Sequence, residues 1–431
     1  MADAASRLVS VAEQLLGAPL PVRVRAWDGS QAGPPGAPVI VVRNRRALRR
    51  MLFKPGELGM ARAWVAGDLD IEGDLYTALG AMAGLLWEHD DEGGGRSLAD
   101  TVRDPAARAA VRDLIRLVGP PLPPAPPREE VRRRRHLHTR RTDKRAISHH
   151  YDVGNDFYAL VLGPSMVYSC AYWEDDGSLE TAQHDKLELV CRKLGLKPGQ
   201  RLLDVGCGWG SMAVHAAREH GVSVVGVTLS QEQAAFARKR VADEGLTDRV
   251  EIRVQDYRDV RDGPYDAISS IGMAEHVGAD RYLEYARDLY GLLKPGGRLL
   301  NHQIARRPQQ DETAYEVDAF IDSYVFPDGE LAPLGTTVTL LERAGFEVRD
   351  VESLREHYAR TLRAWVANLE GDWARATRLA GFGRARVWRL YMAASALAFE
   401  RNQIGVNQVL AVRTPETGTS GLPARTRTWN T

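Results

Sequence analysis

The sequence predicts an α/β fold with a mostly parallel, Rossmann-like sheet for residues 147–413, preceded by a small α+β domain in residues 1–118. Two observations lead to this prediction. Short apolar runs alternate with helical segments after residue 147, as in successive βαβ units. In addition, the run that ends at Val205 leads into a glycine-rich turn and then into a helical pattern.

Composition excludes several classes of protein. The 431 residues are 44% hydrophobic and 26% charged, which is enough for packed cores in two or three domains of about 150 residues. Lys+Arg and Asp+Glu both total 57, so the net charge identifies no partner. No apolar run approaches the ~18 residues of a membrane span and no signal-peptide pattern is present, so we expect a cytoplasmic protein. The three cysteines, Cys170, Cys191 and Cys207, predict no disulfide framework, and no metal-ligand spacing is present.

The first 118 residues contain a helix and two strands by periodicity. Residues 8–16 place Leu and Val on one helical face, residues 22–26 alternate as a strand, and residues 38–43 form an apolar strand. Residues 46–76 look helical, with interruptions at glycines. No catalytic spacing is present in this domain.

Residues 119–146 form a predicted linker. Six of the eight residues from Pro120 to Pro127 are proline, which favours an extended segment. Residues 128–145 carry nine Lys/Arg against three acids. This stretch is either a solvated linker or a basic arm for an anionic membrane surface. Nucleic acid is disfavoured because no aromatic residues are interleaved for stacking. The polar residues 414–431 are expected to be a disordered tail.

The strongest local motif is the glycine turn after the strand of residues 202–205. Asp204 ends the apolar run, and Gly206, Gly208 and Gly210 follow with G-x-G-x-G spacing. A dinucleotide-binding turn would place its third glycine at position 211, which is serine here. Glycines allow a ligand to approach the backbone closely, although an ordinary tight turn has the same composition.

Polar residues follow the later strands of the predicted sheet. Because carboxyl ends of parallel strands meet at one edge, these residues could surround one ligand there. They are Thr228, Ser230 and Gln233 after one strand, Gln255, Asp256 and Tyr257 after the next, Glu275 and His276 after a third, and His302 and Ile304 at a fourth. Tyr168, Ser169 and Cys170 precede one helix, and Tyr358 precedes another. Each residue taken alone could equally be a satisfied polar group of the core.

Six motifs in order, "YSCAYW", "LLDVGCGWG", "VVGVTLS", "QDYRD", "GMAEHVG" and "YARTLRAW", resemble the cyclopropane-fatty-acyl-phospholipid synthase family. The resemblance runs from about Ser148 to Arg413. The long N-terminal part and "YVFPDGEL" are similar to an actinobacterial branch that methylates phospholipid-bound oleoyl chains. The resemblance implies a class I S-adenosylmethionine (SAM)-dependent methyltransferase fold with extra lid helices.

The resemblance also implies roles for individual residues. SAM would be held by Tyr168, Ser169, Asp204, Gly206, Gly208, Gly210, Thr228, Gln233, Gln255, Asp256, Tyr257 and Ile271. A catalytic bicarbonate would be held by Cys170, Glu275, His302, Ile304 and Tyr358. The segment from His149 to Tyr158 would close over the lipid, and the expected substrate contacts are His150, Tyr151, Asp156, Tyr158 and Tyr324.

The implied reaction transfers a methyl group to the cis double bond of a phospholipid acyl chain and leaves a carbocation, which a base deprotonates. The product is a methylene-branched chain or, as the alternative, a cyclopropane. Many cyclopropane synthases have Phe where this chain has Ala274, which favours the methylene product. A methylene product would need a separate reductase to become a saturated methyl branch.

Partners follow from the same resemblance. We expect phospholipid acyl chains and an anionic membrane surface as partners, peripheral membrane association, a homo-oligomer, and an N-terminal domain that serves lipid docking or dimerisation. A small-molecule methyltransferase and a non-catalytic lipid carrier remain alternatives. A DNA methyltransferase is disfavoured because neither an Asn/Asp-Pro-Pro-aromatic loop nor a Pro-Cys nucleophile is present.

Overall fold

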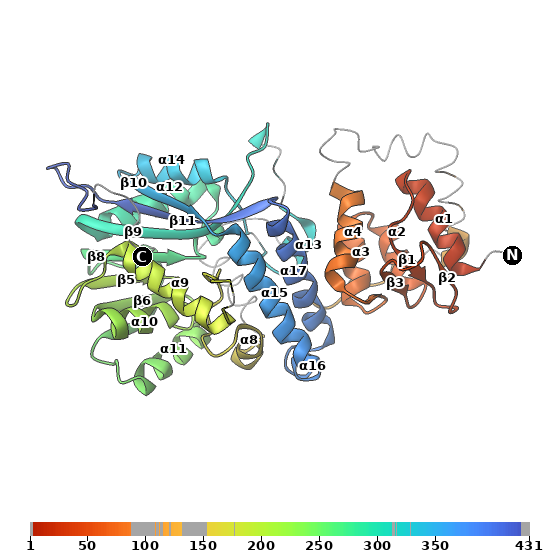
Figure 1. The fold of residues 1–431 in the computed structure, drawn as a ribbon, viewed down its shortest axis with the longest axis horizontal. Coiled ribbons are helices and arrows are strands. Elements are labelled where there is room, and N and C mark those ends of the chain that lie inside the picture. The colour runs from red at the N-terminus through yellow and green to blue at the C-terminus, as the bar shows by residue number, and fades with distance from the viewer. Residues whose placement is uncertain are drawn as a thin grey trace. The chain divides into compact units, whose positions relative to one another are not determined.

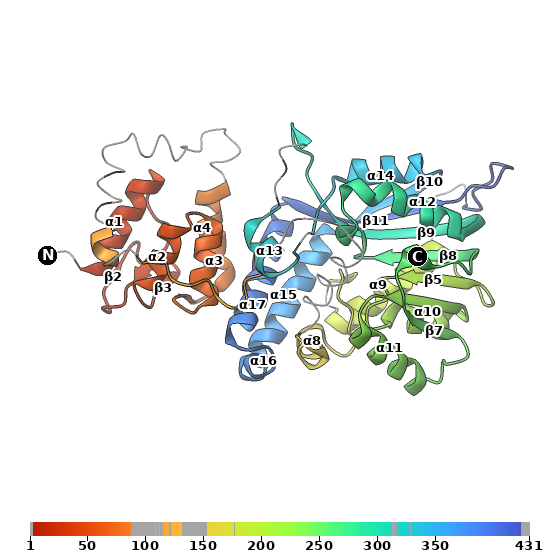
Figure 2. The ribbon, with the colours of Figure 1, turned by 180° about the vertical axis from the view of Figure 1, so that it is seen from behind.

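A computed structural model describes residues 3–87, 108, 112, 115–119, 122–131, 153–175, 177–312, 315, 317–327 and 329–423. Figures 1 and 2 show its elements from opposite sides. The chain divides into two compact units. The smaller unit contains residues 1–132, 318–325 and 381–397, and the larger unit contains residues 133–317, 326–380 and 398–431.

The smaller unit contains a four-stranded sheet in the order β2-β1-β3-β4. The strands are β1 Arg23–Arg25, β2 Gln31–Ala32, β3 Val39–Val42 and β4 Leu69–Glu72. The N-terminal helices are α1 Ala4–Leu16, α2 Arg46–Phe53, α3 Glu57–Val65 and α4 Leu75–Trp87. The expected first helix and two strands are confirmed. The expectation that residues 46–76 are helical is wrong over β4, because Leu69–Glu72 pairs antiparallel with β3.

Two segments from the second half of the sequence belong to the smaller unit: α13 Ala319–Tyr324 and most of α17 Phe382–Glu400. Contacts of Arg386 explain why most of α17 belongs to the smaller unit. Its guanidinium is buried, stacks on the Trp64 ring at 4.0 Å and donates to the Trp64 carbonyl at 2.7 Å. The Leu69 carbonyl also accepts from Arg386 at 2.7 Å. Hydrophobic periodicity carries no information about contacts between residues this far apart in the chain. Both segments are therefore predicted from sequence to belong to the catalytic domain.

The larger unit contains a seven-stranded sheet in the order β10-β11-β9-β8-β5-β6-β7. The strands are β5 Arg201–Val205, β6 Ser223–Thr228, β7 Val250–Val254, β8 Tyr265–Ile271, β9 Leu293–Arg306, β10 Glu347–Ser353 and β11 Ile404–Val412. The pairs from β9 through β7 are parallel, whereas β11 pairs antiparallel with both β9 and β10. The predicted α/β fold with a mostly parallel sheet is therefore confirmed.

Helices cover both faces of this sheet (Figure 1). One core contains Leu202 of β5 with residues of α9 Leu179–Leu194, α10 Ser211–His220 and α11 Gln231–Asp243. The other contains Leu203 with residues of α12 Tyr282–Leu292 and α14 Leu334–Arg343. Successive strand residues point to opposite faces, so burial of both faces explains the nearly continuous apolar runs.

The remaining helices of the larger unit are α8 Asn155–Leu162, α15 Arg355–Gly371 and α16 Trp373–Ala380. With α17, these helices make residues 355–400 almost entirely helical. Among the described residues, no helix is both long and apolar enough to cross a bilayer.

The structure describes residues 414–423 of the polar segment expected to be a disordered tail. The Thr414 hydroxyl donates to Glu347 at 2.6 Å, the Gly421 carbonyl accepts from Arg298 at 3.0 Å, and Leu422 packs against the core. These contacts anchor the polar segment to the sheet. Residues 424–431 and most of the basic stretch, residues 132–145, lie outside the described residues.

Candidate active site

The glycine turn lies between β5 and α10 and has the predicted backbone character. Gly206, Gly208 and Gly210 all have positive φ, at +76°, +53° and +81°. A Cβ on Gly206 would lie 3.1 Å from the Met273 sulfur, whereas one on Gly208 would meet nothing within 4 Å. The helix begins at Ser211, as expected. The turn therefore has exposed backbone with open space beside Gly208, which fits the close approach of a ligand such as SAM.

A buried acid and a buried amine lie beside this turn. Asp204 accepts from the Ser269 hydroxyl at 2.7 Å, and its Oδ2 has no hydrogen-bond partner among the described residues. Burial raises the pKa of Asp204 to about 6, against the lowering effects of Ser269 and the positive charge of Lys186. Lys186, buried on α9, donates to the Ser169 hydroxyl at 3.0 Å. Burial lowers the pKa of this lysine to about 8.

The ends of β6 and β7 bring the next predicted residues together. Thr228 donates to the Gln233 side chain at 2.9 Å, and the Gln255 N–H donates to the Thr228 carbonyl at 3.0 Å. The Asp256 carboxylate pairs with the Arg258 guanidinium at 2.6 Å, and the Tyr257 ring contacts Tyr285. These predicted cofactor residues thus lie at the carboxyl edge of neighbouring strands.

Glu275 lies in a short 3-10 turn, Ala274–His276, that follows β8. Its Oε1 accepts from the backbone N–H of Ile304 on β9 at 2.8 Å. Its Oε2 is buried with no partner in the described part of the chain. Burial raises the pKa of this carboxyl to about 7. Since Oε1 already accepts a hydrogen bond, the proton of the neutral acid belongs on Oε2, where it is available to a ligand.

His302 lies two residues before Ile304, on the same face of β9. Its Nδ1 is 3.3 Å from the Gln408 amide nitrogen, which can only donate, so Nδ1 accepts and the ring hydrogen is on Nε2. Nε2 is buried and has no partner among the described residues. Burial and the charges of Lys186 and Lys193 keep the pKa of His302 well below its usual value. The ring is therefore a neutral donor.

Cys170 and Tyr358 are connected to this group through Leu354. The Leu354 carbonyl accepts from the Cys170 thiol at 3.6 Å and from the Tyr358 N–H at 3.0 Å. The Leu354 N–H in turn donates to Val406, which pairs with Ile304 in the sheet. Burial raises the pKa of Cys170, so its sulfur is a neutral thiol. These contacts, mostly between backbone groups, connect the elements that carry the five residues assigned to the anion.

Aromatic rings form a row from the glycine turn towards Tyr358. Centroid separations are 4.7 Å for Trp209–Tyr158, 5.8 Å for Tyr158–Tyr168, 5.4 Å for Tyr168–Trp365 and 6.0 Å for Trp365–Tyr358. Trp209 also donates to Asn155 at 2.8 Å, which attaches α8 to the turn. Aromatic rings in such contacts pack tightly and exclude water.

The predicted substrate residues have different locations. Tyr158 is buried in the aromatic row, whereas Asp156 is exposed on α8. Tyr324 belongs to the smaller unit, where its hydroxyl donates to Glu130 at 2.9 Å. His150 and Tyr151 lie outside the described residues.

Sequence reasoning missed three residues of this region: Lys186, Met273 and Leu354. Lys186 was detectable, because it occupies the apolar face of the predicted helix that also carries Leu187 and Val190. Met273 acts through packing and Leu354 acts through its backbone carbonyl. Neither kind of contact produces a pattern in the sequence.

The fold and the open glycine turn define a class I SAM-dependent methyltransferase. A structure of mycolic acid cyclopropane synthase from a complex with S-adenosylhomocysteine is similar, with 34% identity and a TM-score of 0.59 over 62% of this chain and 98% of the other. Residues 138–409 match the family described as mycolic acid cyclopropane synthetase, and the chain belongs to this family.

Two curated relatives differ in how much of the chain they match. A probable fatty acid methyltransferase of Mycobacterium tuberculosis is 44% identical over 94% of both chains. The cyclopropane-fatty-acyl-phospholipid synthase of Escherichia coli is 41% identical over 62% of this chain and 68% of its own. Similarity to the first relative therefore includes the N-terminal part.

Proposed function

We propose that the protein transfers the methyl group of SAM to the cis double bond of an unsaturated acyl chain in a phospholipid, with bicarbonate as the base. The observation that carries the proposal is the pair of unpartnered buried groups, Glu275 Oε2 and His302 Nε2. The neutral imidazole of His302 and the protonated form of Glu275 suit a small anion, because each can donate a hydrogen bond without adding a competing negative charge.

When bound, SAM supplies an electrophilic methyl group and bicarbonate supplies a base. The chain's own residues hold these groups at the carboxyl edge of the sheet. The Gly208 backbone would approach SAM, and Lys186 would keep Ser169 in place through its hydrogen bond. The chemistry that SAM would supply is transfer of its sulfonium methyl group to the double bond of the acyl chain, with S-adenosylhomocysteine as the leaving group, which would leave a carbocation on the chain.

The residues near this carbocation must exclude water and offer no nucleophile. The Tyr158–Tyr168–Trp365 part of the aromatic row supplies packed, weakly reactive surface. The Cys170 thiol is neutral and its hydrogen is donated to carbonyl groups, which keeps its nucleophilicity low. Loss of one proton to the base then completes the reaction.

The proposed product is a methylene-branched chain, formed when a hydride shifts to the neighbouring carbon before the new methyl group loses a proton. Full-length similarity to a fatty acid methyltransferase and the small Ala274 beside Glu275 favour this outcome. A cyclopropane is the second candidate, favoured by the family match and by the similarity to cyclopropane synthases. It forms when the new methyl group loses its proton as the ring closes.

The proposal also includes three partners that the sequence suggests. These are an anionic membrane surface for the basic stretch, a homo-oligomer, and a separate reductase that uses a methylene product.

Incubation of the protein with methyl-labelled SAM and dioleoyl phospholipid vesicles tests the proposal. We expect label in the acyl fraction. Label confined to water-soluble products would instead support a small-molecule methyltransferase, and no transfer would support a non-catalytic lipid carrier. Both results would contradict the proposal.

A further inference from the structure

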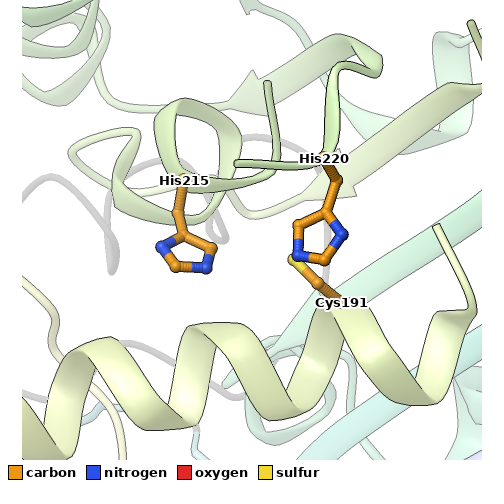
Figure 3. Close-up of side chains that lie close together, drawn as sticks. All are labelled: Cys191, His215 and His220. Atoms are coloured by element: carbon orange, nitrogen blue, oxygen red, sulfur yellow. The ribbon is translucent and has the colours of Figure 1, made fainter. Parts of the chain in front are cut away.

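A second group of chemically reactive side chains lies away from the candidate active site. Cys191 on α9 faces His215 and His220 on α10, and one potential ligand atom from each residue lies within 4.8 Å of the others (Figure 3). Cys191 and His215 are buried, and His220 is partly buried. The described residues form no other group of three or more such ligands within this distance.

Glu188 connects the two histidines. Its Oε2 is 3.2 Å from Nε2 of His215 and 2.9 Å from Nε2 of His220. Glu188 precedes Cys191 by three residues on α9, which places both on one side of that helix. Its other oxygen accepts from Arg192 at 2.8 Å, which fixes the carboxylate. Cys191, His215 and His220 therefore converge from two helices that pack together, and Glu188, which contacts both histidines but is not within 4.8 Å of all three ligand atoms, is the candidate fourth ligand.

The chemistry of this ligand set selects a particular class of ion. One thiolate, two imidazoles and one carboxylate are ligands that Zn²⁺ and related borderline-soft divalent ions prefer, whereas Mg²⁺ and Ca²⁺ prefer oxygen. Tetrahedral Zn²⁺ sites with bonds of about 2.0–2.3 Å place ligand atoms about 3.3–3.8 Å apart. Small side-chain rotations would bring ligands within 4.8 Å into this range.

A purely structural explanation accounts for only part of the cluster. A carboxylate that accepts from two histidines is a satisfied hydrogen-bond network and requires no thiol. Cys191 adds a buried sulfur beside this network. The combination of sulfur with two imidazoles is therefore the feature that points to a metal ion.

We propose that Cys191, His215, His220 and Glu188 form a Zn²⁺ site that links α9 to α10. On binding, the thiol proton leaves to solvent and no electron transfer is involved. Both helices have a direct connection to the candidate active site, because α9 carries Lys186 and α10 begins at the end of the glycine turn. The ion would hold these helices together and so stabilise the turn.

The sequence does not reveal the complete ligand set, because the four residues come from two helices, with 23 residues between Cys191 and His215 along the chain. The two histidines have four residues between them, a spacing that also occurs in zinc sites, but no cysteine pair precedes them at the distance of a recognised zinc motif. Packing of α10 on α9 is what brings the side chains together.

Cobalt titration of the full-length chain, after treatment with a chelator, tests the proposal. Co²⁺ replaces Zn²⁺ in such sites, and a thiolate ligand produces a sulfur-to-cobalt charge-transfer band. We expect about one Co²⁺ per chain with this band, displacement of the band by Zn²⁺, and a Zn²⁺-dependent rise in Tm of about 3 °C or more.

Variants assign the ligands. Cys191→Ser, which is nearly isosteric, should abolish the band, and His220→Asn should weaken Co²⁺ binding at least tenfold. His184→Asn is the matched control, because His184 is an exposed histidine whose ring lies 5.1 Å from that of His215 but is not part of the cluster. Circular dichroism confirms that each variant is folded. Absence of the band in the unaltered chain, or a band that survives in folded Cys191→Ser, would overturn the proposal.

Discussion

Glu275 accepts the backbone N–H of Ile304 through Oε1 at 2.8 Å, while its Oε2 is buried with no partner among the described residues. One oxygen thus fixes the carboxyl group against β9 and the other is available to a ligand. Burying a polar atom without a partner costs about 1–3 kcal/mol, so the arrangement suggests that a ligand completes it.

The first prediction concerns turnover. Glu275→Gln keeps the shape of the side chain but replaces the acidic O–H donor with a much less acidic amide N–H, which donates a weaker hydrogen bond to an anion. We expect methyl transfer to fall by about 100-fold or more, with the Kd for SAM changed less than about twofold. Steady-state kinetics and calorimetry measure the two quantities. Full activity of this variant without added bicarbonate would refute the assigned role.

The same variant changes how stability depends on pH. The pKa of Glu275 rises from 4.5 to about 7 on folding, so the folded state binds more protons and the unaltered protein loses stability as pH rises through this window. The loss amounts to about 3 kcal/mol. Glu275→Gln lacks this dependence, so its stability relative to the unaltered protein should increase between pH 4.5 and pH 7. Urea unfolding at several pH values measures the difference, and a constant difference would show that the carboxyl is not desolvated.

Cofactor binding depends on the backbone at the glycine turn. Gly206→Val should abolish SAM binding, because φ is +76° and the added Cβ would lie 3.1 Å from the Met273 sulfur. Gly245→Val is the matched control: Gly245 has φ +67° but lies beyond α11 with open space around it. Both variants should lose stability, and only the first should lose SAM affinity by equilibrium dialysis. Equal affinities would mean that the cofactor lies elsewhere.

The buried amine of Lys186 should support the same site. Lys186→Met removes the hydrogen bond to Ser169, and we expect the Kd for SAM to increase about tenfold. Lys193→Met provides a control on the same helix, since Lys193 is equally buried but pairs with Glu352 on β10. This control should lose stability and retain SAM affinity. A similar Kd increase in both variants would indicate a general effect on the helix.

Much of the larger unit was predictable from sequence. The apolar runs around Leu202 and Val224 are buried on both faces, and such runs identify parallel strands. It was not predictable from sequence which segments make up the smaller unit. Arg386 reaches Trp64 across more than 300 residues of sequence, and a buried arginine on a helix gives no periodic signal of its partner.

The site was predictable where strand ends determine it. Glu275 lies in the turn that follows β8 and His302 lies on β9, and since these strands are neighbours in a parallel sheet, topology places both residues at the same edge. The protonation state of each side chain was not predictable, because it depends on contacts such as that of Gln408 with His302 and that of Ile304 with Glu275. The ligand cluster at Cys191 depends equally on helix packing.

The most direct test of the central claim is mass spectrometry of dioleoyl phospholipid after incubation with SAM that carries a ¹³C methyl group. We expect the acyl chain to gain one ¹³C atom and two hydrogens at the former double bond, and Glu275→Gln to lower this gain without loss of SAM binding. Unchanged acyl chains in the presence of SAM-bound protein would refute the proposed methyl transfer.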